Sequence, residues 1–596
     1  MMSERAGAPD IAGAEPPLAD SAAVAAVVAA GWPQDLPAST YALIERAANR
    51  FGDETALTFI MDARRPDPVS TWSCHQYREA VTRVANVFHH LGAGEGDVIA
   101  MVLPNLPETF FCLWGAEACG VALPINPLLE AEGVADLLRA SGARIVVTTA
   151  PFPGVDLYDK VMAAVNSAPG IAAVVTVDLA PHVRGWKALP ARVQQWRARR
   201  SAPALRGGVS STRLERAAAL APGDGLASGR TPRGSDLASL FCTGGTTGAP
   251  KLARRTHANE VAYAFMSTRM LGDAMPRGSI VFAGLPLFHC NGAMVTGLSP
   301  LLFGGHVLLG TPQGYRGPGV VSGFWDIVAR HRVNLLSGVP TLFSSLLQHP
   351  PARQDISALR FAICGAAPRS TELIGRFEAA TGITILEGYG LTEATCVAAL
   401  NPLTGTRHAG SVGLPLPFQQ ARIAVLDNAG VWVRDAAPGE TGTLALAGPN
   451  VFAGYHSDGH NRGLWLTDPE GGTWLDTGDL GALDPLGYLW LRGRTKDIII
   501  RGGHNIDPAV IEDAFYAHPA VALAAAIGRP DPHAGEVPVV YVELKPGAVA
   551  DPAALMAFAE TRISERAARP KAVEIISAMP LTAVGKVHKP SLRALL

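Results

Sequence analysis

The run at residues 243–251 most constrains what this chain can fold into. It reads Thr-Gly-Gly-Thr-Thr-Gly-Ala-Pro-Lys and directly follows the apolar residues 237–241. Glycines allow a backbone to turn tightly and to direct its N–H groups at an anion, and threonine hydroxyls and a lysine add donors and positive charge. The run therefore has the composition of a phosphate-binding loop, which a flexible turn could also share. It is not a Walker A loop, because Pro250 precedes Lys251 and Leu252 follows it.

Length and composition limit the class of protein. A chain of 596 residues is too long for one hydrophobic core, so we expect two or more domains. Its 48% hydrophobic and 17% charged residues are typical of a soluble globular protein, and a formal net charge of −2 gives no indication of nucleic acid as a partner. The seven cysteines form no CxxC pair, which argues against a zinc site and a disulfide framework and fits a cytoplasmic location.

The N-terminal residues 1–40 are expected to be a partly disordered lead-in with a short helix. Its apolar stretch at residues 22–30 is too short to span a membrane and lacks a preceding basic region. We therefore expect neither a signal peptide nor an integral membrane segment. The sequence is compatible with an oligomer but does not indicate one.

Helices and strands alternate through the following part of the chain. Apolar residues recur with helical spacing at 41–51 and 72–91, and short apolar segments typical of buried strands lie at 98–103, 143–148 and 172–177. This alternation predicts an α/β fold, in which a large domain, residues 41–495, contains mainly parallel sheets covered by helices.

The character of the chain changes after Gly487. Short strands are predicted at 488–491 and 498–500, on either side of a charged joint at 492–497, and further strands at 523–527 and 537–544. We therefore expect a small α+β domain at residues 496–596, with the boundary at Lys496.

Residues 181–235 form an arginine-rich insertion, interleaved with alanine, glycine and proline. One interpretation is a patch that contacts a membrane surface or the phosphates of CoA, and the other is a solvated helical insertion. Its basic residues are Arg184, Lys187, Arg192, Arg197, Arg199, Arg200, Arg206, Arg213 and Arg216.

Six further segments accompany the loop in a fixed order along the chain. Together with it they resemble the motifs of the acyl-adenylate-forming, or AMP-binding, superfamily, of the acyl-CoA synthetase type, over residues 40–596. The loop departs from the family at Gly244, where a serine is usual, so one hydroxyl contact to phosphate is missing. The segments are Leu-Pro-Leu-Phe-His at 285–289, Cys-Gly-Ala-Ala-Pro at 364–368, Glu-Gly-Tyr-Gly-Leu-Thr-Glu at 387–393, Trp-Leu-Asp-Thr-Gly-Asp-Leu at 474–480, Lys-Asp-Ile-Ile-Ile-Arg-Gly-Gly-His-Asn-Ile at 496–506, and Pro-Leu-Thr-Ala-Val-Gly-Lys-Val-His-Lys at 580–589.

The resemblance implies an ATP site in which Tyr389 faces the adenine, Asp479 and Arg494 hold the ribose, and Thr392 and Glu393 bind Mg²⁺. Oxygen ligands of this kind suit a hard cation. Read without the resemblance, Thr392 could be a helix cap, and Asp479 and Arg494 a surface ion pair. The residues implied to bind ATP or AMP are Thr243, Gly244, Gly245, Thr246, Thr247, Gly248, Lys251, Gly365, Ala366, Ala367, Glu387, Gly388, Tyr389, Thr392, Asp479, Arg494 and Lys586.

The resemblance also implies the residues that act on the substrate. Lys586, Thr246, Glu393 and His289 would be catalytic, and the small domain would be mobile about a hinge at Lys496. His289 would line the acyl pocket with two glycines, although a histidine at a strand end is also an ordinary core residue. The glycines of the acyl pocket are Gly365 and Gly390, and those of the CoA tunnel are Gly502 and Gly503.

The implied reaction has two steps, adenylation of a carboxylic acid by ATP and transfer of the acyl group to CoA. Glycine at both 365 and 390 predicts an open pocket and hence a medium-chain, aromatic or otherwise bulky acid. Two alternatives pass the acyl group to a carrier-protein phosphopantetheine or stop at the adenylate, as a fatty-acyl-AMP ligase does. A non-catalytic nucleotide-binding protein would be expected to lack Lys586, Glu393 or Asp479, and all three are present.

Overall fold

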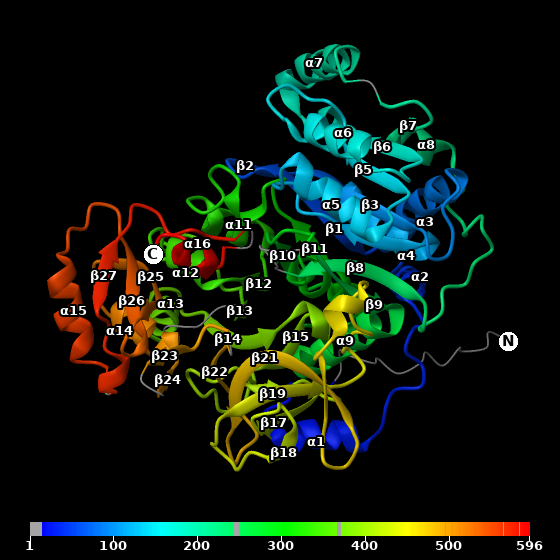
Figure 1. Ribbon diagram of the computed structural model, residues 1–596. Helices are drawn as coiled ribbons and strands as arrows, with labels where there is room; N and C mark the ends of the chain where they lie inside the picture. Colours follow the sequence, from blue (N-terminus) through cyan, green and yellow to red (C-terminus); the bar gives the residue numbers. More distant parts are fainter. Residues whose placement is uncertain are drawn as a thin grey trace.

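The computed structural model describes residues 15–203, 205–243, 250–365, 371–494, 496–501, 504–563, 565–582 and 585–596. Its strands form four sheets (Figure 1). Two large, mainly parallel sheets with their helices make up most of the N-terminal part, a third sheet is antiparallel, and the fourth belongs to the small C-terminal unit. This arrangement confirms the predicted α/β class with a small C-terminal domain.

The larger parallel sheet has nine strands. Its central strands pair in parallel, and antiparallel pairing occurs only at the two margins. In spatial order the strands are β16 (Leu414–Pro415), β15 (Val397–Leu400), β14 (Thr384–Gly390), β13 (Phe361–Cys364), β12 (Leu335–Gly338), β10 (Ile280–Ala283), β11 (His306–Leu309), β1 (Thr55–Asp62) and β2 (Arg65–Ser73).

The second parallel sheet has seven strands, and the predicted strands at 98–103, 143–148 and 172–177 form its centre. These strands are buried along their whole length, which explains why they consist of continuous apolar residues rather than alternating ones. In spatial order the strands are β7 (Ser210–Arg213), β6 (Ala173–Val177), β5 (Ile145–Thr149), β3 (Val98–Val102), β4 (Val121–Pro124), β8 (Leu237–Thr243) and β9 (Lys251–Thr256).

The helices of the large part cover these sheets. The two helices predicted from periodicity begin at capping residues: Ser39 accepts from the N–H of Ala42, and Ser73 forms a capping box with Gln76. The helices are α1 (Ser21–Ala29), α2 (Thr40–Phe51), α3 (Cys74–His90), α4 (Pro107–Cys119), α5 (Ala131–Ser141), α6 (Leu157–Ser167), α7 (Ala188–Arg200), α8 (Leu214–Leu220), α9 (His257–Leu271), α10 (Ser299–Leu302), α11 (Phe324–His331), α12 (Pro340–Leu346) and α13 (Thr371–Thr381).

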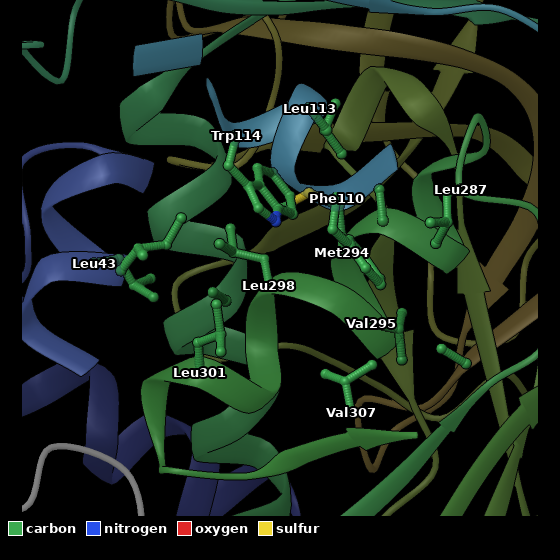
Figure 2. Close-up of a cluster of buried hydrophobic side chains, with 14 of the residues drawn as sticks. Leu43, Phe110, Leu113, Trp114, Leu287, Met294, Val295, Leu298, Leu301 and Val307 are labelled. Atoms are coloured by element: carbon green, nitrogen blue, oxygen red, sulfur yellow. The ribbon is translucent and has the colours of Figure 1, made fainter. Parts of the chain in front are cut away.

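The main hydrophobic core lies where α2 and α4 meet the segment that follows His289. This segment is a π-helix, η4 (Asn291–Leu298), which is an uncommon structure that is frequent at functional sites. Figure 2 shows side chains of this helix and of the elements around it, and those that it labels belong to one buried cluster. They include Leu43, Phe110, Leu113, Trp114, Leu287, Met294, Val295, Leu298, Leu301 and Val307.

The antiparallel sheet holds two residues of the predicted ATP site directly opposite each other. Its strands β21 and β22 pair Asp479 with Arg494 in register. In spatial order the strands are β18 (Trp432–Asp435), β17 (Gln420–Leu426), β19 (Gly442–Ala447), β21 (Thr473–Leu483) and β20 (Trp465–Thr467), and β22 (Leu489–Arg494) pairs with β21.

The small C-terminal unit has its own sheet and its own buried core, centred on residues such as Ile511, Phe515 and Leu555. Its helices are α14 (Pro508–Tyr516), α15 (Pro552–Glu560) and α16 (Lys589–Arg593). Its strands are β24 (His504–Ile506), β23 (Ile499–Arg501), β26 (Gly535–Leu544) and β25 (Val521–Asp531), with β27 (Ala572–Ile575) paired to β26.

The described part of the N-terminal segment contains the short helix α1 and contacts the large domain. From Glu15 onward it packs on the end of α9: the N–H of Leu18 donates to the carbonyl of Met270, and Glu15 forms an ion pair with Arg269. The arginine-rich insertion contains the helices α7 and α8 and the edge strand β7. Among the helices of the described ranges, none has the length and apolar character needed to cross a membrane.

Candidate active site

The carboxyl ends of several parallel strands bring the predicted site residues to one region. Strands β10, β12, β13 and β14 run in parallel, so the segments that follow them share one edge of the nine-stranded sheet. His289 follows β10, Gly365 follows β13, and Thr392 and Glu393 follow β14. Open α/β sheets bind ligands at such an edge.

Tyr389, Asp479 and Arg494 form one hydrogen-bonded group. The phenol of Tyr389 donates to Oδ2 of Asp479 at 2.5 Å, and Nε of Arg494 donates to Oδ1 at 2.8 Å. Asp479 is buried and Arg494 is exposed, so this is not a pair of two exposed surface side chains. The nearby Asp479 carboxylate raises the pKa of Arg494. A fixed, buried carboxylate of this kind suits recognition of a diol.

Glu393 lies in a second group, centred on Tyr455. The phenol of Tyr455 donates a hydrogen bond to Oε1 of Glu393, and Nζ of Lys251 lies 5.3 Å from the centre of the tyrosine ring. Burial and the Glu393 carboxylate raise the pKa of Tyr455, and a hydrogen bond with the Thr243 side chain opposes them. Burial also raises the pKa of Glu393. One tyrosine thus contacts both ends of the glycine-rich loop and the predicted magnesium ligand.

Sequence reasoning missed Tyr455. It stands in the segment Gly454-Tyr455-His456, outside the quoted motifs, and the sequence shows there only an aromatic residue after a glycine. The structure brings it to the site because the segment pairs with β9, through an isolated bridge between Ala253 and Tyr455.

A short 3₁₀ helix, η6 (Thr392–Ala394), carries Thr392 and Glu393. It ends at Thr395, which has a φ of 65°, a rare conformation for a β-branched residue. Two contacts hold this turn: Nη1 of Arg255 donates to the carbonyl of Thr395 at 2.9 Å, and the Thr395 hydroxyl donates to the carbonyl of Asn450 at 2.6 Å. The surrounding structure therefore fixes the position of the Glu393 backbone.

His289 is half-buried at the start of the π-helix. Its Nδ1 accepts a hydrogen bond from the N–H of Asn291 at 3.3 Å, so the neutral ring carries its proton on Nε2. The thiol of Cys290 lies 3.8 Å from that Nδ1 and 3.9 Å from the hydroxyl of Thr392. His289 and Thr392 therefore lie close together on either side of one buried cysteine.

Lys586 reaches the large domain from the small one. The hydroxyl of Thr341 donates to the carbonyl of Gly585 at 3.2 Å, which ties the lysine loop to the start of α12. Within the loop, the N–H of Lys586 donates to the hydroxyl of Thr582 at 3.1 Å. Burial lowers the pKa of Lys586, Arg494 lowers it further, and Asp479 opposes both, so the ammonium group lies within the electrostatic field of the predicted ribose site.

Gly390 is closely packed against the backbone that leads into β15. A Cβ atom at this position would lie 2.0 Å from the carbonyl oxygen of Cys396 and 2.8 Å from Cα of Val397. The close approach of the backbone at Cys396 and Val397 is one reason why position 390 needs a glycine. The role of Gly390 in an acyl pocket stays a prediction. At Gly365 the nearest atom of the described residues to an added Cβ, the carbonyl oxygen of Gly388, is 3.9 Å away.

An apolar cavity of about 30 Å³ lies behind the strand that contacts Gly390. It is lined by residues of α9, of the π-helix, of β13 and of β15, among them Tyr263, Ser267, Val295, Ile363 and Val397. Its present volume holds about one water molecule, so a larger guest would require these side chains to move. The polar pair Tyr263 and Ser267, one turn apart in a mostly apolar helix, is the sequence signal that could have indicated it.

Several predicted residues lie outside the described ranges. These are Gly244, Gly245, Thr246, Thr247 and Gly248 of the loop, Ala366 and Ala367 of the segment at 364–368, and Gly502 and Gly503 of the predicted CoA tunnel.

The remaining predicted residues are described, and their roles remain predictions. Glu387 is buried, and its Oε2 accepts from the N–H of Gly410 at 3.4 Å. Gly388 is packed against Leu400, 3.0 Å from an added Cβ. Lys496 lies in a turn whose neighbour Asp497 forms an ion pair with Arg593 at 2.7 Å.

The magnesium prediction fits the residues present. Within the described ranges, no cluster of three or more histidine, cysteine, aspartate or glutamate side chains could hold a metal ion. Mg²⁺ commonly needs only one or two carboxylates and takes its other ligands from phosphates and water. A single half-buried carboxylate at Glu393, beside the Thr392 hydroxyl, suits an ion that arrives with ATP.

Comparison with known proteins agrees with this geometry. Residues 44–456 match the family model of the AMP-binding enzyme, and residues 510–586 match that of the AMP-binding enzyme C-terminal domain. A marinolic acid–CoA ligase of Pseudoalteromonas sp. (strain SANK 73390) is 36% identical over 92% of this chain and 79% of its own length. A long-chain-fatty-acid–CoA ligase of Bacillus subtilis (strain 168) is 29% identical over 94% of this chain and 96% of its own.

Solved structures show the same fold. ATP-bound MatB from Rhodopseudomonas palustris superposes with a TM-score of 0.73 at 26% identity, over 94% of this chain and 99% of that one. The anthranilate CoA ligase AuaEII in complex with anthranoyl-AMP superposes with a TM-score of 0.77 at 22% identity, over 95% and 98% of the two chains. The chain therefore belongs to the AMP-binding enzyme family, and within it to the AMP-forming acyl-CoA ligases.

Proposed function

We propose that this enzyme activates a medium-chain, aromatic or otherwise bulky carboxylic acid with ATP and transfers the acyl group to CoA. The observation that carries the proposal is the position of Lys586: its loop contacts the large domain through the hydrogen bond from the Thr341 hydroxyl to the carbonyl of Gly585, although the lysine belongs to the other domain. A lysine held there can act on a nucleotide bound by the large domain.

In the first step, a carboxylate oxygen of the acid attacks the α-phosphorus of ATP, the bond to the bridging oxygen breaks, and pyrophosphate leaves. Negative charge develops on the α-phosphate and on the leaving group. The ammonium of Lys586 and the side chain of Lys251 would stabilise this charge. Mg²⁺, held by Glu393 and Thr392, would neutralise phosphate charge when it is bound. Because the substrate supplies the nucleophile, positioning makes up much of the catalysis.

In the second step, the CoA thiolate attacks the acyl carbon of the adenylate, the bond to the phosphate oxygen breaks, and AMP leaves. Before this step Lys586 would leave the site. Its departure would break the contact between its loop and Thr341 on the large domain. Rotation of the small domain about Lys496 would remove the lysine and bring residues 502–503 toward the site. His289, with its Nε2 proton available, would line the path between the adenylate and the thiol.

The class of acid rests on two features. Among the described residues, no atom lies closer than 3.9 Å to a Cβ added at Gly365, and the cavity beside β15 has an apolar lining. Relatives named for marinolic acid, long-chain fatty acids and sulfoacetate differ widely in the acids that they activate. We therefore base the preference for a bulky acid on the apolar lining rather than on any relative.

A pyrophosphate-release screen tests the proposal. Purified enzyme is supplied with ATP, Mg²⁺ and each of acetate, hexanoate, decanoate, benzoate and sulfoacetate, with and without CoA, and acyl-CoA is measured in parallel. The proposal expects decanoate or benzoate to exceed acetate and sulfoacetate in kcat/KM, and acyl-CoA to accumulate only when CoA is present. A preference for acetate or sulfoacetate would contradict the substrate class. Adenylate formation without thioester would favour a carrier-protein acceptor or an acyl-AMP ligase.

A further inference from the structure

The arginine-rich insertion presents an apolar stripe to solvent. The stripe runs along the 3₁₀ helix η2 (Gly185–Lys187) and α7, at positions three or four residues apart, which places its members on one face. The four side chains are Trp186, Leu189, Val193 and Trp196, with exposed fractions of 80%, 71%, 42% and 53%. Single exposed apolar residues are ordinary, but four on one helical face, two of them tryptophan, form a continuous patch.

Polar contacts fix this orientation from the opposite face of α7. Ala191 and Gln195 are the buried residues of the helix, and Oε1 of Gln195 accepts from the N–H of Ala180 at 3.1 Å. Arg199 forms an ion pair with the buried Asp178, which also pairs with Arg213 beside it on β7. The helix therefore buries small and polar residues against the domain and directs its large apolar residues outward, the reverse of an ordinary surface helix.

The patch is strongly basic. Residues 179–214 contain no aspartate or glutamate. Arg192, Arg197 and Arg200 are exposed along α7, the guanidinium of Arg200 lies 4.2 Å from the ring centre of Trp196, and Nζ of Lys187 lies 5.5 Å from that of Trp186. Positive charge thus surrounds the apolar stripe on the same surface.

The location of α7 leaves this surface accessible. Figure 1 shows the helix at the periphery of the molecule, beyond the strands of the seven-stranded sheet and away from the small C-terminal domain. A partner at α7 would therefore not obstruct the movement of the small domain that the proposed mechanism requires.

We propose that the segment at residues 184–200, here called the α7 patch, docks on the surface of a bilayer that contains anionic phospholipid. A helix with this combination of residues lies in the plane of the interface, with its apolar side chains among the upper acyl chains and its arginines at the lipid phosphates. Tryptophan rings prefer the level of the headgroups. Nucleic acid would match the charge but leave the Leu189 and Val193 side chains uncovered, so the bilayer is the occupant that fits both properties.

Vesicle flotation of the full-length enzyme tests this docking. It is preferred to tryptophan fluorescence because the chain has 10 tryptophans, and the others would mask a change at the α7 patch. We expect the enzyme to float with vesicles of phosphatidylcholine and phosphatidylglycerol, to float much less with phosphatidylcholine alone, and to be released by high salt, since screening weakens the attraction of arginines for anionic lipid.

Two sets of substitutions separate the apolar and the basic contribution. Trp186→Ser/Leu189→Ser/Trp196→Ser should weaken partitioning roughly tenfold or more, because each apolar side chain contributes to insertion. Arg192→Gln/Arg197→Gln/Arg200→Gln should weaken it on the order of 100-fold at low salt. Control variants alter exposed residues of the apolar and the basic kind outside the α7 patch, Val431→Ser/Val433→Ser and Arg353→Gln/Arg566→Gln, and should float like the parent.

Adenylation of a water-soluble acid and the thermal unfolding midpoint are measured for every variant, so that a misfolded protein is recognised. Loss of flotation in either α7 set, with both measurements at the parent level, supports the proposal. Equal flotation with and without phosphatidylglycerol, or flotation of both α7 variants at the level of their controls, would overturn it. Because the patch lies outside the ATP site, this result is independent of the proposed substrate class.

Discussion

The phenol of Tyr455 donates a hydrogen bond to the carboxylate of Glu393, and the same ring lies against the side chain of Lys251. Glu393 is the proposed magnesium ligand and Lys251 closes the glycine-rich loop, so one tyrosine aligns two groups that would act on the same phosphates. A charged hydrogen bond of this kind contributes more than a neutral one. Tyr455 is therefore a positioning residue, acting through Glu393 and Lys251.

Tyr455→Phe keeps the ring and removes only the hydroxyl. We expect kcat/KM for adenylation to fall by about 10- to 100-fold, because a hydrogen bond to a charged group contributes about 1.5–3 kcal/mol. The KM for Mg²⁺ should rise more than the KM for the acid, which a merely structural role would not produce. Tyr488→Phe is the matched control, since it also removes one phenolic hydrogen bond, to the carbonyl of Thr406. Equal losses in the two variants would contradict the role of Tyr455.

The two glycines predicted to line the acyl pocket, Gly365 and Gly390, should differ in how much an added methyl group changes the stability of the protein. Gly390→Ala places a Cβ against the backbone of Cys396, where no side chain can move aside, so it should destabilise the protein by more than 1 kcal/mol, about the cost of overpacking a core. Gly365→Ala meets no atom closer than 3.9 Å and should fold like the parent. Thermal unfolding midpoints and kcat/KM on benzoate and decanoate distinguish them. A Gly390→Ala variant with the stability of the parent and an altered preference among acids would instead support a position of Gly390 in the acyl pocket.

The sequence predicted the secondary-structure elements better than it predicted the contacts between residues that are distant along the chain. Continuous apolar segments indicated β3, β5 and β6 correctly, because strands buried on both faces need no polar alternation. A sequence shows that Gly390 has no side chain but not that the backbone of Cys396 occupies its place. Tyr455 was missed because only the bridge between two distant segments brings it to the site. The direction of the α7 stripe likewise depends on the tertiary contact between Arg199 and Asp178.

His306 should make the large domain sensitive to acid. Burial lowers the pKa of this residue from its ordinary value of 6.5 to about 4, with a further contribution from His331. The unfolded chain therefore binds a proton more tightly than the folded one, and stability present above pH 6.5 is lost as the pH falls toward 4. When the pH falls from 7 to 5, the free energy of unfolding of the His306→Gln variant should decrease by about 1–2 kcal/mol less than that of the parent. Thermal unfolding midpoints measure this, with exposed His349→Gln as control, which should behave like the parent.

Lys496→Pro tests the hinge. Proline fixes φ and so stiffens the joint between the two domains. We expect adenylation and thioester formation to be impaired to different degrees, because the variant should be held nearer to one of the two orientations. The two rates are measured separately, by pyrophosphate release in the absence of CoA and by transfer from a supplied acyl-adenylate. Parent-like rates in both would place the hinge elsewhere.

The central claim is that Lys586 acts in adenylation and not in thioester formation, and Lys586→Ala tests it most directly. The same preparation is assayed for pyrophosphate release with ATP and acid, and for acyl-CoA formation from a supplied acyl-adenylate and CoA. Removing one charge that stabilises the transition state should lower the first rate on the order of 100- to 1,000-fold. The second rate should stay near that of the parent and near that of the control Lys571→Ala, which alters an exposed lysine of the same domain. Equal loss of both rates would contradict the account.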